Sequence, residues 1–515
     1  ELTIGSEGFW WPEMTPSPVR TGTMIIARRW SVSSMKEDES LDASSPVESG
    51  AVLNSFGNRP LANIIVEGLR ALQETPGASS PAEKFLDQNE SASSPIRRIG
   101  ILTGGGPASG HNAVIYAAFL EAKKRGIELV AIWQGWKGLI EHSLVTSARP
   151  LTLTDVQPYR YEGGTILVTS RENPYSVESV EKWYPQILWS NIRKLRLGGL
   201  LTLGGDDTIS VSYYLQQEHP DFLIIGLPKT MDDDLNLPPG VSTYGFDSFI
   251  KASVELVRNG IIDVRSTNRI LVVESFGRSA GFTPLRIGAL VRASRTLIPE
   301  ERKLDLEKIL ADLAVYHQAH GYAGVVVSEG VKINKAFANN AACLAQAFAK
   351  DPVAQAAFEA VTDVDAFGNP KLQNAGLIIA AILKAGLKGI GISLAGKLDY
   401  LVRSAPASEV DRAMCELLGQ SAIERIANGE HGILLYVLRD KVGSLKLTPK
   451  LGGREVDIAG KDREEFFQAN QALTNSSNRD ASSSPIDSRT GKVRSSSPAG
   501  NEGPPAFGEL GKPAD

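Results

Sequence analysis

Charged side chains suited to phosphate chemistry are concentrated in two short loops. The first loop has the sequence GGDDT (204–208), and the second has the sequence PKTMDDD (228–234). Together they hold five aspartates, one lysine and two threonines. Carboxylates that repel one another need a cation between them, and Mg²⁺ with phosphate oxygens is the usual solution. The sequence therefore predicts a magnesium–phosphate site, and the alternative is two solvated acidic turns that never meet.

Each loop follows an apolar run of strand length, 199–203 before the first and 222–226 before the second. Apolar runs with polar residues only at the C-terminal end are typical of buried parallel strands covered by helices on both faces. Ligands of such sheets bind outside the carboxyl ends of the strands. We therefore expect both loops to line one crevice.

A glycine-rich loop, TGGGPASGHN (103–112), joins an expected strand at 98–102 to an expected helix at 113–125. Glycines let the backbone approach a ligand, and a helix N-terminus offers unpaired N–H groups to an anion. The loop lacks the Lys-Ser/Thr ending of a Walker loop, and the next strand, 129–133, ends without an acidic residue to hold a ribose. Phosphate binding is favoured, and a plain tight turn is the alternative.

A different chemistry is suggested by Gly277-x-Ser279-x-Gly281, which directly follows an expected strand at 269–274. This is the pattern of a hydrolase nucleophile elbow, with His317, His320 or His431 as a candidate base. A serine hydrolase would leave the two acidic loops without a role. The same glycines can instead bring backbone amides to a phosphate or a sugar, with Arg278 adding a positive charge.

Composition restricts the class of protein. The 515 residues carry a net charge of −5 without a basic block, so nucleic acid is not an expected partner. No run of about 18 apolar residues is present, so no membrane span is expected. The two cysteines form no disulfide framework, which favours a reducing compartment and a cytoplasmic protein. The six histidines show no metal-ligand spacing, and no zinc site is indicated.

Low-complexity tails flank a core in which strand and helix signals alternate. Residues 1–96 and the C-terminal extension, 446–515, are rich in polar residues with repeated Ser-Ser-Pro, and both are expected to be mostly disordered apart from a short helix at 56–73. Alternation in the core predicts an α/β protein with a parallel sheet covered on both faces. Further expected strands are 324–328 and 432–437, and further expected helices are 180–195, 304–317, 338–360 and 409–427.

The order of the motifs resembles the phosphofructokinase family. The matching segments are TGGGPASGHNAVI (103–115), GGTILVTSR (163–171), GGDDT (204–208), PKTMDDD (228–234), YGFDS (244–248), TNRILVVESFGRSAG (267–281), VVVSEG (325–330) and YLVRSAPASEVDR (400–412). The resemblance covers about residues 97–445. It implies a two-lobed α/β fold of parallel sheets in Rossmann-like three-layer arrangement, with a diphosphate and Mg²⁺ lobe at 97–237 and a sugar-phosphate lobe at 238–445.

The resemblance also assigns roles to residues of the two acidic loops. Asp232 matches the general base that takes the proton from the sugar 1-hydroxyl, and Asp234 lies beside it. Asp206 matches the Mg²⁺ ligand, and Thr230 matches the threonine near the transferred phosphoryl group. The residues matched to catalysis are Asp232, Thr230, Lys229 and Arg171, and those matched to diphosphate binding are Gly105, Gly106, Asp207 and Lys229.

Other matching positions belong to the sugar phosphate. Arg278 and Arg171 match arginines at the phosphoryl and sugar sites, and Glu329 matches the glutamate that binds sugar hydroxyls. Arg403 and Arg269 match arginines on the 6-phosphate; the counterpart of Arg269 reaches across from a neighbouring subunit, which implies a homodimer or a homotetramer. The residues matched to substrate binding are Asp234, Arg269, Gly277, Arg278, Glu329, Tyr400 and Arg403.

Two positions bear on the phosphoryl donor. Nucleotide-using members have glycine where Asp207 and Lys229 stand. A carboxylate at 207 would obstruct a nucleotide's α-phosphate, and an ammonium at 229 would compensate diphosphate charge. The pair therefore resembles the pyrophosphate-dependent branch, whereas Trp136, near the position of a ring-stacking tyrosine, does not discriminate.

The expected reaction is reversible phosphoryl transfer from Mg-pyrophosphate to fructose 6-phosphate. Three departures leave a larger ketose phosphate open as the acceptor. Leu394 or a neighbour stands where nucleotide-using members have a phosphate-binding arginine, whose part Lys397 could take; Tyr400 stands in for a histidine; and Phe276 stands where the family usually has a methionine. The alternatives are an ATP-dependent phosphofructokinase, a serine hydrolase and a non-catalytic regulatory protein.

Overall fold

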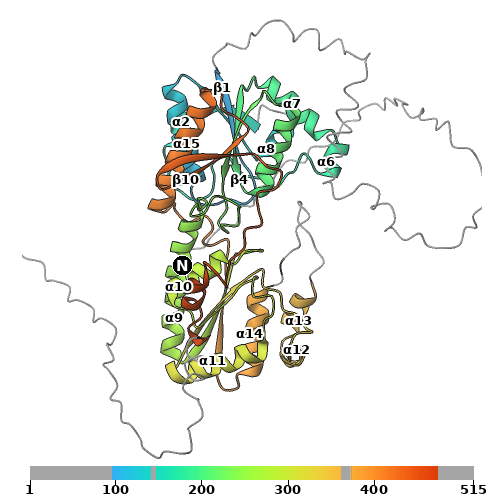
Figure 1. Cartoon of the computed structure of the whole chain (residues 1–515), viewed down its shortest axis with the longest axis vertical. Helices are drawn as coiled ribbons and strands as arrows, with labels where there is room; N and C mark the ends of the chain where they lie inside the picture. The colour runs from blue at the N-terminus through green and yellow to red at the C-terminus, as the bar shows by residue number, and fades with distance from the viewer. Residues whose placement is uncertain (1–95, 141–146, 361–371, 373, 474–515) are drawn as a thin grey trace, which may run out of the picture. The chain divides into compact units, whose positions relative to one another are not determined.

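The computed structural model describes residues 96–140, 147–360, 372 and 374–473. The expected helix at 56–73 lies outside this part of the chain. Two separate sheets organise the described residues, and helices cover each sheet (Figure 1). None of the helices in these ranges is long and apolar enough to cross a membrane.

The first sheet has seven strands in the order β11-β10-β5-β4-β1-β2-β3. Its five inner strands are parallel, while β3 and β11 pair antiparallel at the two edges. The strand β4, with sequence GLLTLG, is buried at every position, as expected for a strand covered on both faces. The strands are β1 (Arg98–Thr103), β2 (Glu128–Ile132), β3 (Ala148–Pro150), β4 (Gly199–Gly204), β5 (Leu223–Pro228), β10 (Ile433–Leu438) and β11 (Lys441–Lys446).

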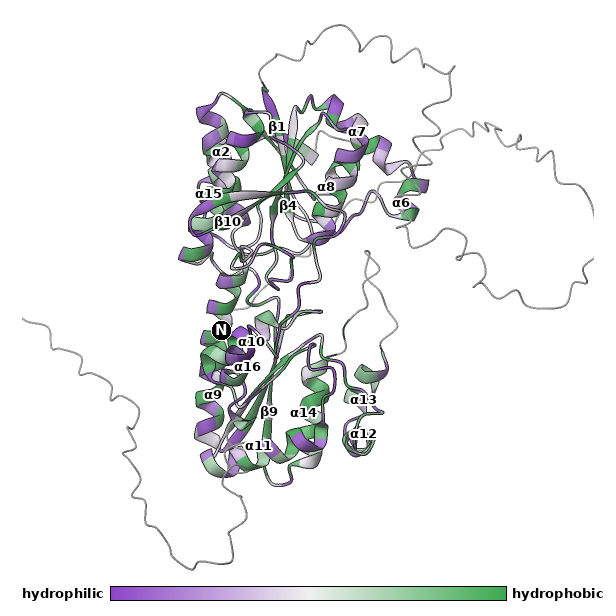
Figure 2. Cartoon of the chain, in the orientation of Figure 1, coloured by the Kyte–Doolittle hydropathy of each residue, from purple (hydrophilic) through white to green (hydrophobic). Residues whose placement is uncertain are grey.

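Alternate residues of these strands enter two different cores. Ile99 and Ile101 pack with α2 (His111–Lys124) and α15 (Glu409–Ala427), whereas Leu102 faces the other side of the sheet. On that side lie α3 (Trp136–Ile140), α7 (Tyr184–Lys194) and α8 (Asp206–Glu218). The apolar interior of the strands and the polar outer surface of the helices are visible in Figure 2. The short helices α5 (Leu153–Val156) and α6 (Val177–Glu181) complete this half.

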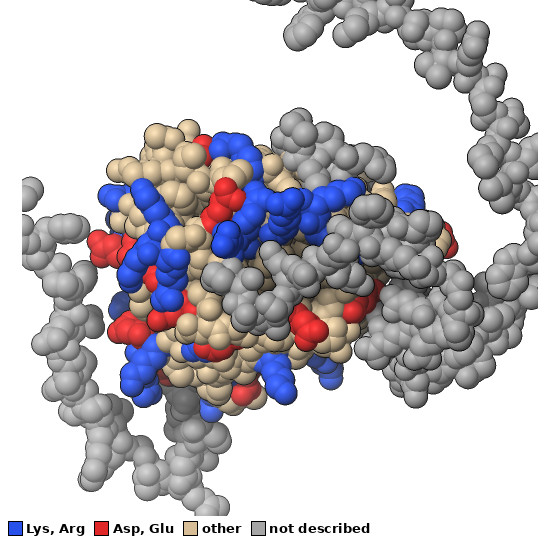
Figure 3. Space-filling model, turned by 90° about the horizontal axis from the view of Figure 1, so that it is seen from above, with Lys and Arg blue, Asp and Glu red and all other residues tan. Residues whose placement is uncertain are grey.

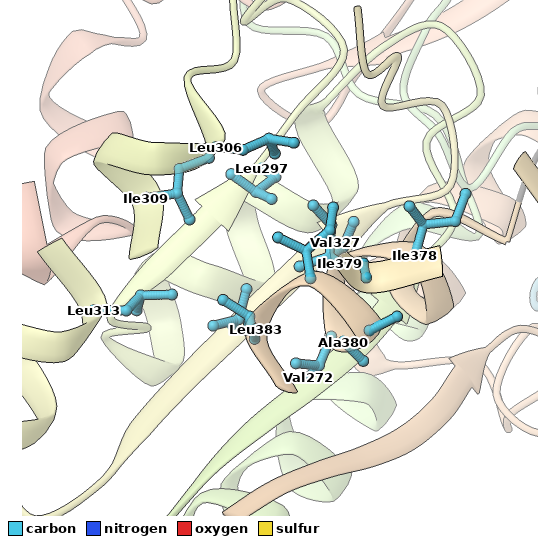
Figure 4. Packing of buried hydrophobic residues seen from close by; sticks show 14 of the residues in the cluster. Val272, Leu297, Leu306, Ile309, Leu313, Val327, Ile378, Ile379, Ala380 and Leu383 are labelled. Atoms are coloured by element: carbon cyan, nitrogen blue, oxygen red, sulfur yellow. The ribbon is translucent and has the colours of Figure 1, made fainter. Parts of the chain in front are cut away.

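The second sheet has four parallel strands in the order β7-β8-β6-β9. These are β6 (Arg269–Ser275), β7 (Arg295–Leu297), β8 (Ala323–Ser328) and β9 (Gly391–Leu398). Side chains of α11 and α14 interlock with strand side chains such as Val272 and Val327 (Figure 4). The helices around this sheet are α9 (Phe246–Thr267), α10 (Phe282–Val291), α11 (Leu306–His320), α12 (Asn340–Phe348), α13 (Pro352–Glu359), α14 (Ala375–Gly386) and α16 (Arg463–Gln468).

The C-terminal part of the described chain divides between the two sheets. The segment that holds α15, β10 and β11 returns to the first sheet, so the division into 97–237 and 238–445 does not follow the sheets. Residues 447–473, the first part of the expected extension 446–515, contain α16 and contribute Phe466 to a buried core with Phe282 and Leu285. The assignment of donor and acceptor to the two halves stays a prediction.

Two expected helices are each divided by a local backbone feature. The expected helix at 180–195 is α6 and α7, because Trp183 adopts a left-handed φ of 61° between them. The expected helix at 338–360 is α12 and α13, because Pro352 cannot continue a helix and begins a new one. The side chain of Asp351 caps that second helix by accepting from the N–H of Ala354.

Candidate active site

The glycine loop and the two acidic loops meet at the carboxyl ends of β1, β4 and β5. The N–H of Gly104 donates to the carbonyl of Leu203 at 2.8 Å, and the N–H of Lys229 donates to the carbonyl of Gly204 at 2.9 Å. Thr208 packs so closely on Gly104 and Gly204 that a Cβ on either glycine would lie 2.3 Å from its Oγ1. The structure therefore brings all three loops to one edge of the sheet.

Three positively charged side chains gather at the glycine loop. The ammonium of Lys229 is 3.6 Å from where a Cβ on Gly105 would lie, and only 6% of Lys229 is exposed. Burial lowers the pKa of Lys229 to about 8, helped by the charges of Arg403 and Arg171. Like charges that lower one another's pKa favour a site built for an anion, since an anion between them would remove the repulsion.

Arg403 reaches the same loop from the other half of the chain. Its Nε donates to the carbonyl of Pro107 at 3.2 Å, and its guanidinium lies 5.5 Å from the ring centroid of Phe276. A Cβ on Gly106 would lie 1.8 Å from Nη2 of Arg403. The structure thus places Arg403 against the glycine loop, and its expected contact with the sugar 6-phosphate stays a prediction.

Replacing Gly106 by alanine is expected to raise the KM for a phosphate-bearing substrate of this loop roughly 10-fold, the cost of about one charge-assisted hydrogen bond. The backbone of Gly106 does not need a positive φ, so the added methyl acts through its clash with Arg403. Steady-state kinetics of Gly106→Ala, Arg403→Met and the double variant test this cause. If Gly106→Ala is as harmful in the Arg403→Met background as alone, the effect does not pass through Arg403.

The three successive aspartates of the second acidic loop (228–234) lie in different environments. Asp233 has a left-handed φ of 53° and is buried, accepting hydrogen bonds from the Oγ of Ser242 and the N–H of Thr243 and pairing with Arg454 at 2.9 Å. The left-handed turn at Asp233 separates it from its two neighbours. Asp232 and Asp234 are left to interact with the cations of the site.

Asp232 has the properties of a poised base. Its Oδ1 is buried and accepts no hydrogen bond from the part of the chain that the structure describes, while its N–H donates to Oγ1 of Thr230 at 3.1 Å. Burial and the nearby charge of Asp234 raise the pKa of Asp232 to about 7, against the opposing charges of Lys229 and Arg278. A carboxyl with this pKa can take a proton near neutral pH.

Asp206 is held by the backbone of a distant segment. Its Oδ1 accepts hydrogen bonds from the N–H groups of Leu451 and, at 2.9 Å, Gly452. Burial raises the pKa of Asp234, a hydrogen bond from Thr230 lowers it, and the charge of Asp206 raises it further. Asp207 follows in the first turn of α8.

These carboxylates fit a magnesium ion that is shared with phosphate. No group of three or more potential protein ligands occurs among residues 96–140, 147–360, 372 and 374–473. Mg²⁺ is commonly held by one or two carboxylates together with substrate phosphates and waters. Asp206 and Asp234, whose mutual repulsion raises the pKa of Asp234, are suited to that arrangement. The assignment of Asp206 as a metal ligand stays a prediction.

Glu329 and Arg278 both interact electrostatically with Asp232. Burial raises the pKa of Glu329 to about 8, with contributions from the charges of Asp232 and Glu274, and Lys397 and Arg278 oppose the rise. Gly277 has a φ of 132°, and a Cβ there would lie 2.8 Å from the carbonyl of Ala280, so this position requires glycine. Near neutral pH Glu329 can thus act as either a carboxylate or a protonated carboxyl, and its expected contact with sugar hydroxyls stays a prediction.

Lys397 pairs with a buried carboxylate. Its Nζ is 2.8 Å from Oε1 of Glu274, whose Oε2 accepts from the N–H of Gly376 at the start of α14. A bulge in β9, where Gly396 has a φ of 84°, sets Lys397 opposite Glu274 in the sheet. Glu274 therefore competes with the 6-phosphate that Lys397 was expected to hold.

Several expected residues lie apart from this cluster. Arg269 is exposed at the amino end of β6, roughly 20 Å along the strand from the loop that follows its carboxyl end. Tyr400 and Arg171, by contrast, are exposed beside the cluster: the Tyr400 ring centroid lies 5.6 Å from the guanidinium of Arg403, and the charge of Arg171 lowers the pKa of Lys229. Trp136 is 2% exposed within a core, so its ring is not available to stack on a base.

The geometry offers little to the hydrolase interpretation. Ser279 follows the carboxyl end of β6, whereas Nε2 of His317 lies 3.2 Å from the carbonyl of Asn268 at the amino end of the same strand. His320 bonds the carbonyl of Tyr316 within its own helix. These two candidate bases are therefore directed away from Ser279, and the third, His431, is exposed just before β10 of the first sheet.

Four residues with contacts in the site were not expected from the sequence: Glu274, Leu451, Gly452 and Arg454. Glu274 sits inside a recognised motif, so a buried charge in an apolar strand was a signal available in the sequence. The other three lie in the stretch LGGRE (451–455), beyond the range of the resemblance. Their contacts with Asp206 and Asp233 join residues more than 200 positions apart, which no local pattern indicates.

Comparison with known proteins places the chain in a class. A family model described as phosphofructokinase matches residues 98–426. The chain therefore belongs to the phosphofructokinase family and is a phosphotransferase. The recognition of this family from the motifs is confirmed, as is the α/β fold.

The names of individual relatives specify two different phosphoryl donors, pyrophosphate and ATP. A pyrophosphate–fructose 6-phosphate 1-phosphotransferase of Dictyoglomus thermophilum is 32% identical over 359 residues, which cover 68% of this chain and 92% of that protein. One from Thermotoga maritima is 40% identical over 208 residues, 40% of this chain but only 48% of that protein. An ATP-dependent 6-phosphofructokinase of a Sulfurihydrogenibium species is 29% identical and spans 66% and 89% of the two chains.

Among solved structures, a pyrophosphate-dependent phosphofructokinase from Marinobacter aquaeolei has a TM-score of 0.56 at 20% identity. The match covers 73% of this chain and 91% of that chain. At this identity the likeness supports the fold.

Proposed function

We propose that this chain transfers a phosphoryl group reversibly from Mg-pyrophosphate to the 1-hydroxyl of fructose 6-phosphate. The observation that carries the donor assignment is the buried ammonium of Lys229 against the glycine loop, with Arg403 beside it. A compact diphosphate satisfies these cations, whereas the carboxylate of Asp207 would repel the α-phosphate of a nucleotide. The names of the relatives from Dictyoglomus and Thermotoga agree with this donor.

In the proposed mechanism, Asp232 accepts the proton of the sugar hydroxyl as its oxygen attacks the terminal phosphorus of pyrophosphate. The bond between that phosphorus and the bridging oxygen breaks, and inorganic phosphate leaves. Lys229 and Arg278 stabilise negative charge that develops on the phosphoryl oxygens. Mg²⁺, held by Asp206 and Asp234, would supply further charge neutralisation when bound. Reaction through in-line positioning needs no covalent enzyme intermediate.

The acceptor is assigned from the opposite side of the pocket. Glu329 and Arg278 interact electrostatically with Asp232, which supports an acceptor bound there, and the exposed Arg269 is suited to reach the 6-phosphate of a neighbouring subunit. A homodimer or homotetramer follows from that role. A larger ketose phosphate remains the second acceptor to test, because Leu394 and Phe276 change the pocket.

The direct test is phosphorylation of fructose 6-phosphate with Mg²⁺, supplied in parallel with pyrophosphate and with ATP. Turnover with pyrophosphate that exceeds turnover with ATP is the expected result. Turnover that is greater with ATP would overturn the donor assignment and favour the ATP-dependent members of the family. Silence with both donors, on this sugar and on larger ketose phosphates, would favour a non-catalytic role.

A further inference from the structure

The segment from Leu451 to Val456 lies beyond the residues matched by the family model, yet it contacts both sides of the site. It follows β11 of the first sheet and precedes α16, which packs on α10 of the second half. Leu451 and Gly452 donate their N–H groups to the Asp206 carboxylate. The carbonyl of Leu451 accepts from the N–H of Asn236 at 2.8 Å.

The same segment also fixes the loop of three aspartates. The N–H groups of Gly453 and Arg454 donate to the carbonyl of Asp234 at 3.1 and 3.0 Å. The guanidinium of Arg454 pairs with Oδ2 of Asp233 at 2.9 Å and lies 4.4 Å from the ring centroid of Phe282. Arg454 therefore bridges the aspartate loop and the start of α10, which follows the loop that holds Gly277 and Arg278.

A second link, through Glu300, connects the segment to the end of the loop that holds Gly277 and Arg278. Oε1 of Glu300 accepts hydrogen bonds from the N–H of Val456 and from the N–H of Gly281, each at 2.8 Å. The segment is thus fastened at Asp206, at Asp233 and Asp234, and at Gly281. These are the loops that hold the proposed metal, base and sugar groups.

Arg454 compensates the negative charge of the buried Asp233 carboxylate. Asp233 is buried, and Arg454 is the cation that pairs with its carboxylate at 2.9 Å. A buried carboxylate that loses its cation is strongly destabilised, and the chain around it must rearrange or protonate it. Because Asp232 and Asp234 flank Asp233, any such rearrangement moves both of them.

We propose that Arg454 is a positioning residue for phosphoryl transfer, acting through Asp233 to hold Asp232 and Asp234 in their productive places. The inference rests on the proposed function for its kinetic test. Arg454 itself contacts neither donor nor acceptor in this mechanism. Outer partners that orient functional carboxylates commonly change activity or metal affinity by 10-fold to 100-fold when they are removed.

The test compares Arg454→Met, Arg454→Lys, Asp233→Asn and the double variant Arg454→Met/Asp233→Asn with the unaltered chain. For each protein, kcat and both KM values are measured well below its melting temperature, and the affinity for Mg-pyrophosphate without sugar is measured by calorimetry. Arg302→Met is the matched control, because Arg302 forms an exposed ion pair with Glu455 of the same segment at 3.2 Å.

We expect Arg454→Met to lower kcat roughly 10-fold to 100-fold and to weaken Mg-pyrophosphate binding about 10-fold, with partial rescue by lysine. The double variant should regain melting temperature, because no buried charge is left alone, but should keep the low kcat. Arg302→Met should match the unaltered chain.

Two outcomes would overturn the inference. Unchanged kcat and unchanged calorimetric affinity in Arg454→Met would show that the segment does not position the loop. Recovery of kcat together with melting temperature in the double variant would show that Arg454 only stabilises the fold. If the unaltered chain binds Mg-pyrophosphate but turns over neither donor, the proposed function fails, and the calorimetric comparison alone decides the role of Arg454.

Discussion

Replacing Asp232 by asparagine is expected to lower kcat by a factor of about 10² to 10⁴, the usual contribution of a positioned general base. Asparagine has nearly the same volume, so the packing around the loop should be retained. It cannot take the proton of the sugar hydroxyl, and it removes the carboxylate whose Oδ1 is buried without a hydrogen bond from the described residues. Steady-state kinetics in both directions measure the loss.

The pH dependence of kcat/KM tests the same role of Asp232. Asp232 must be ionised to act as a base, and its pKa is raised to about 7, so kcat/KM should rise as pH increases through that value. Lys229 must be protonated to bind the donor, and its pKa is lowered to about 8, so kcat/KM should fall again above it. The result is a bell-shaped profile whose rising limb is lost in Asp232→Asn.

A matched control separates catalysis from charge removal. Asp221 is exposed and precedes β5, at the edge of the sheet opposite the site, so Asp221→Asn should keep both kcat and the rising limb. A profile of Asp232→Asn that keeps its rising limb, or a loss of activity shared by Asp221→Asn, would contradict the assignment of Asp232 as the base.

The positions of the functional loops could be predicted because one local rule governs them. Polar residues that follow buried parallel strands lie at the carboxyl edge of the sheet, so Asp206 and Asp232 were expected in one crevice. The helix over 409–427 was also predicted with the observed bounds of α15, in which Cys415, Leu418 and Ala422 recur at helical spacing on the buried face and an internal glycine is tolerated. In these places local pattern and tertiary structure agree.

The remaining features depend on contacts between distant residues. The return of α15 and β10 to the first sheet is a matter of topology, and nothing within those segments shows which sheet they join. Arg403 meets the glycine loop across 296 positions of the chain at Pro107. Arg454 likewise finds Asp233 only in the folded chain. By contrast, α9 could have been recognised, since Phe249, Val257 and Val264 recur on one face.

Exchanging the pair Asp207 and Lys229 for glycines is expected to lower pyrophosphate turnover by about 10² to 10³, as for the loss of one preorganised charged group at a developing charge. The buried ammonium of Lys229 lies next to the glycine loop, where no water replaces it easily. The single variants should separate two effects. Lys229→Gly should lose turnover with pyrophosphate, whereas Asp207→Gly should mainly remove the obstacle to a nucleotide.

Variants of Asp207 and Lys229 also show whether the phosphoryl donor is selected when it binds or at the chemical step. If Asp207 excludes ATP by volume and like charge, Asp207→Gly should gain binding of Mg-ATP, measured by calorimetry, before any gain of turnover. ATP binding that stays absent would mean that another group closes the nucleotide site, since the buried Trp136 offers no ring for the base. ATP turnover in the unaltered chain above its pyrophosphate turnover would instead contradict the role given to both residues. Lys229 would then serve the γ-phosphate of a nucleotide, and the cation cluster at Gly105 and Gly106 would be a general phosphate site.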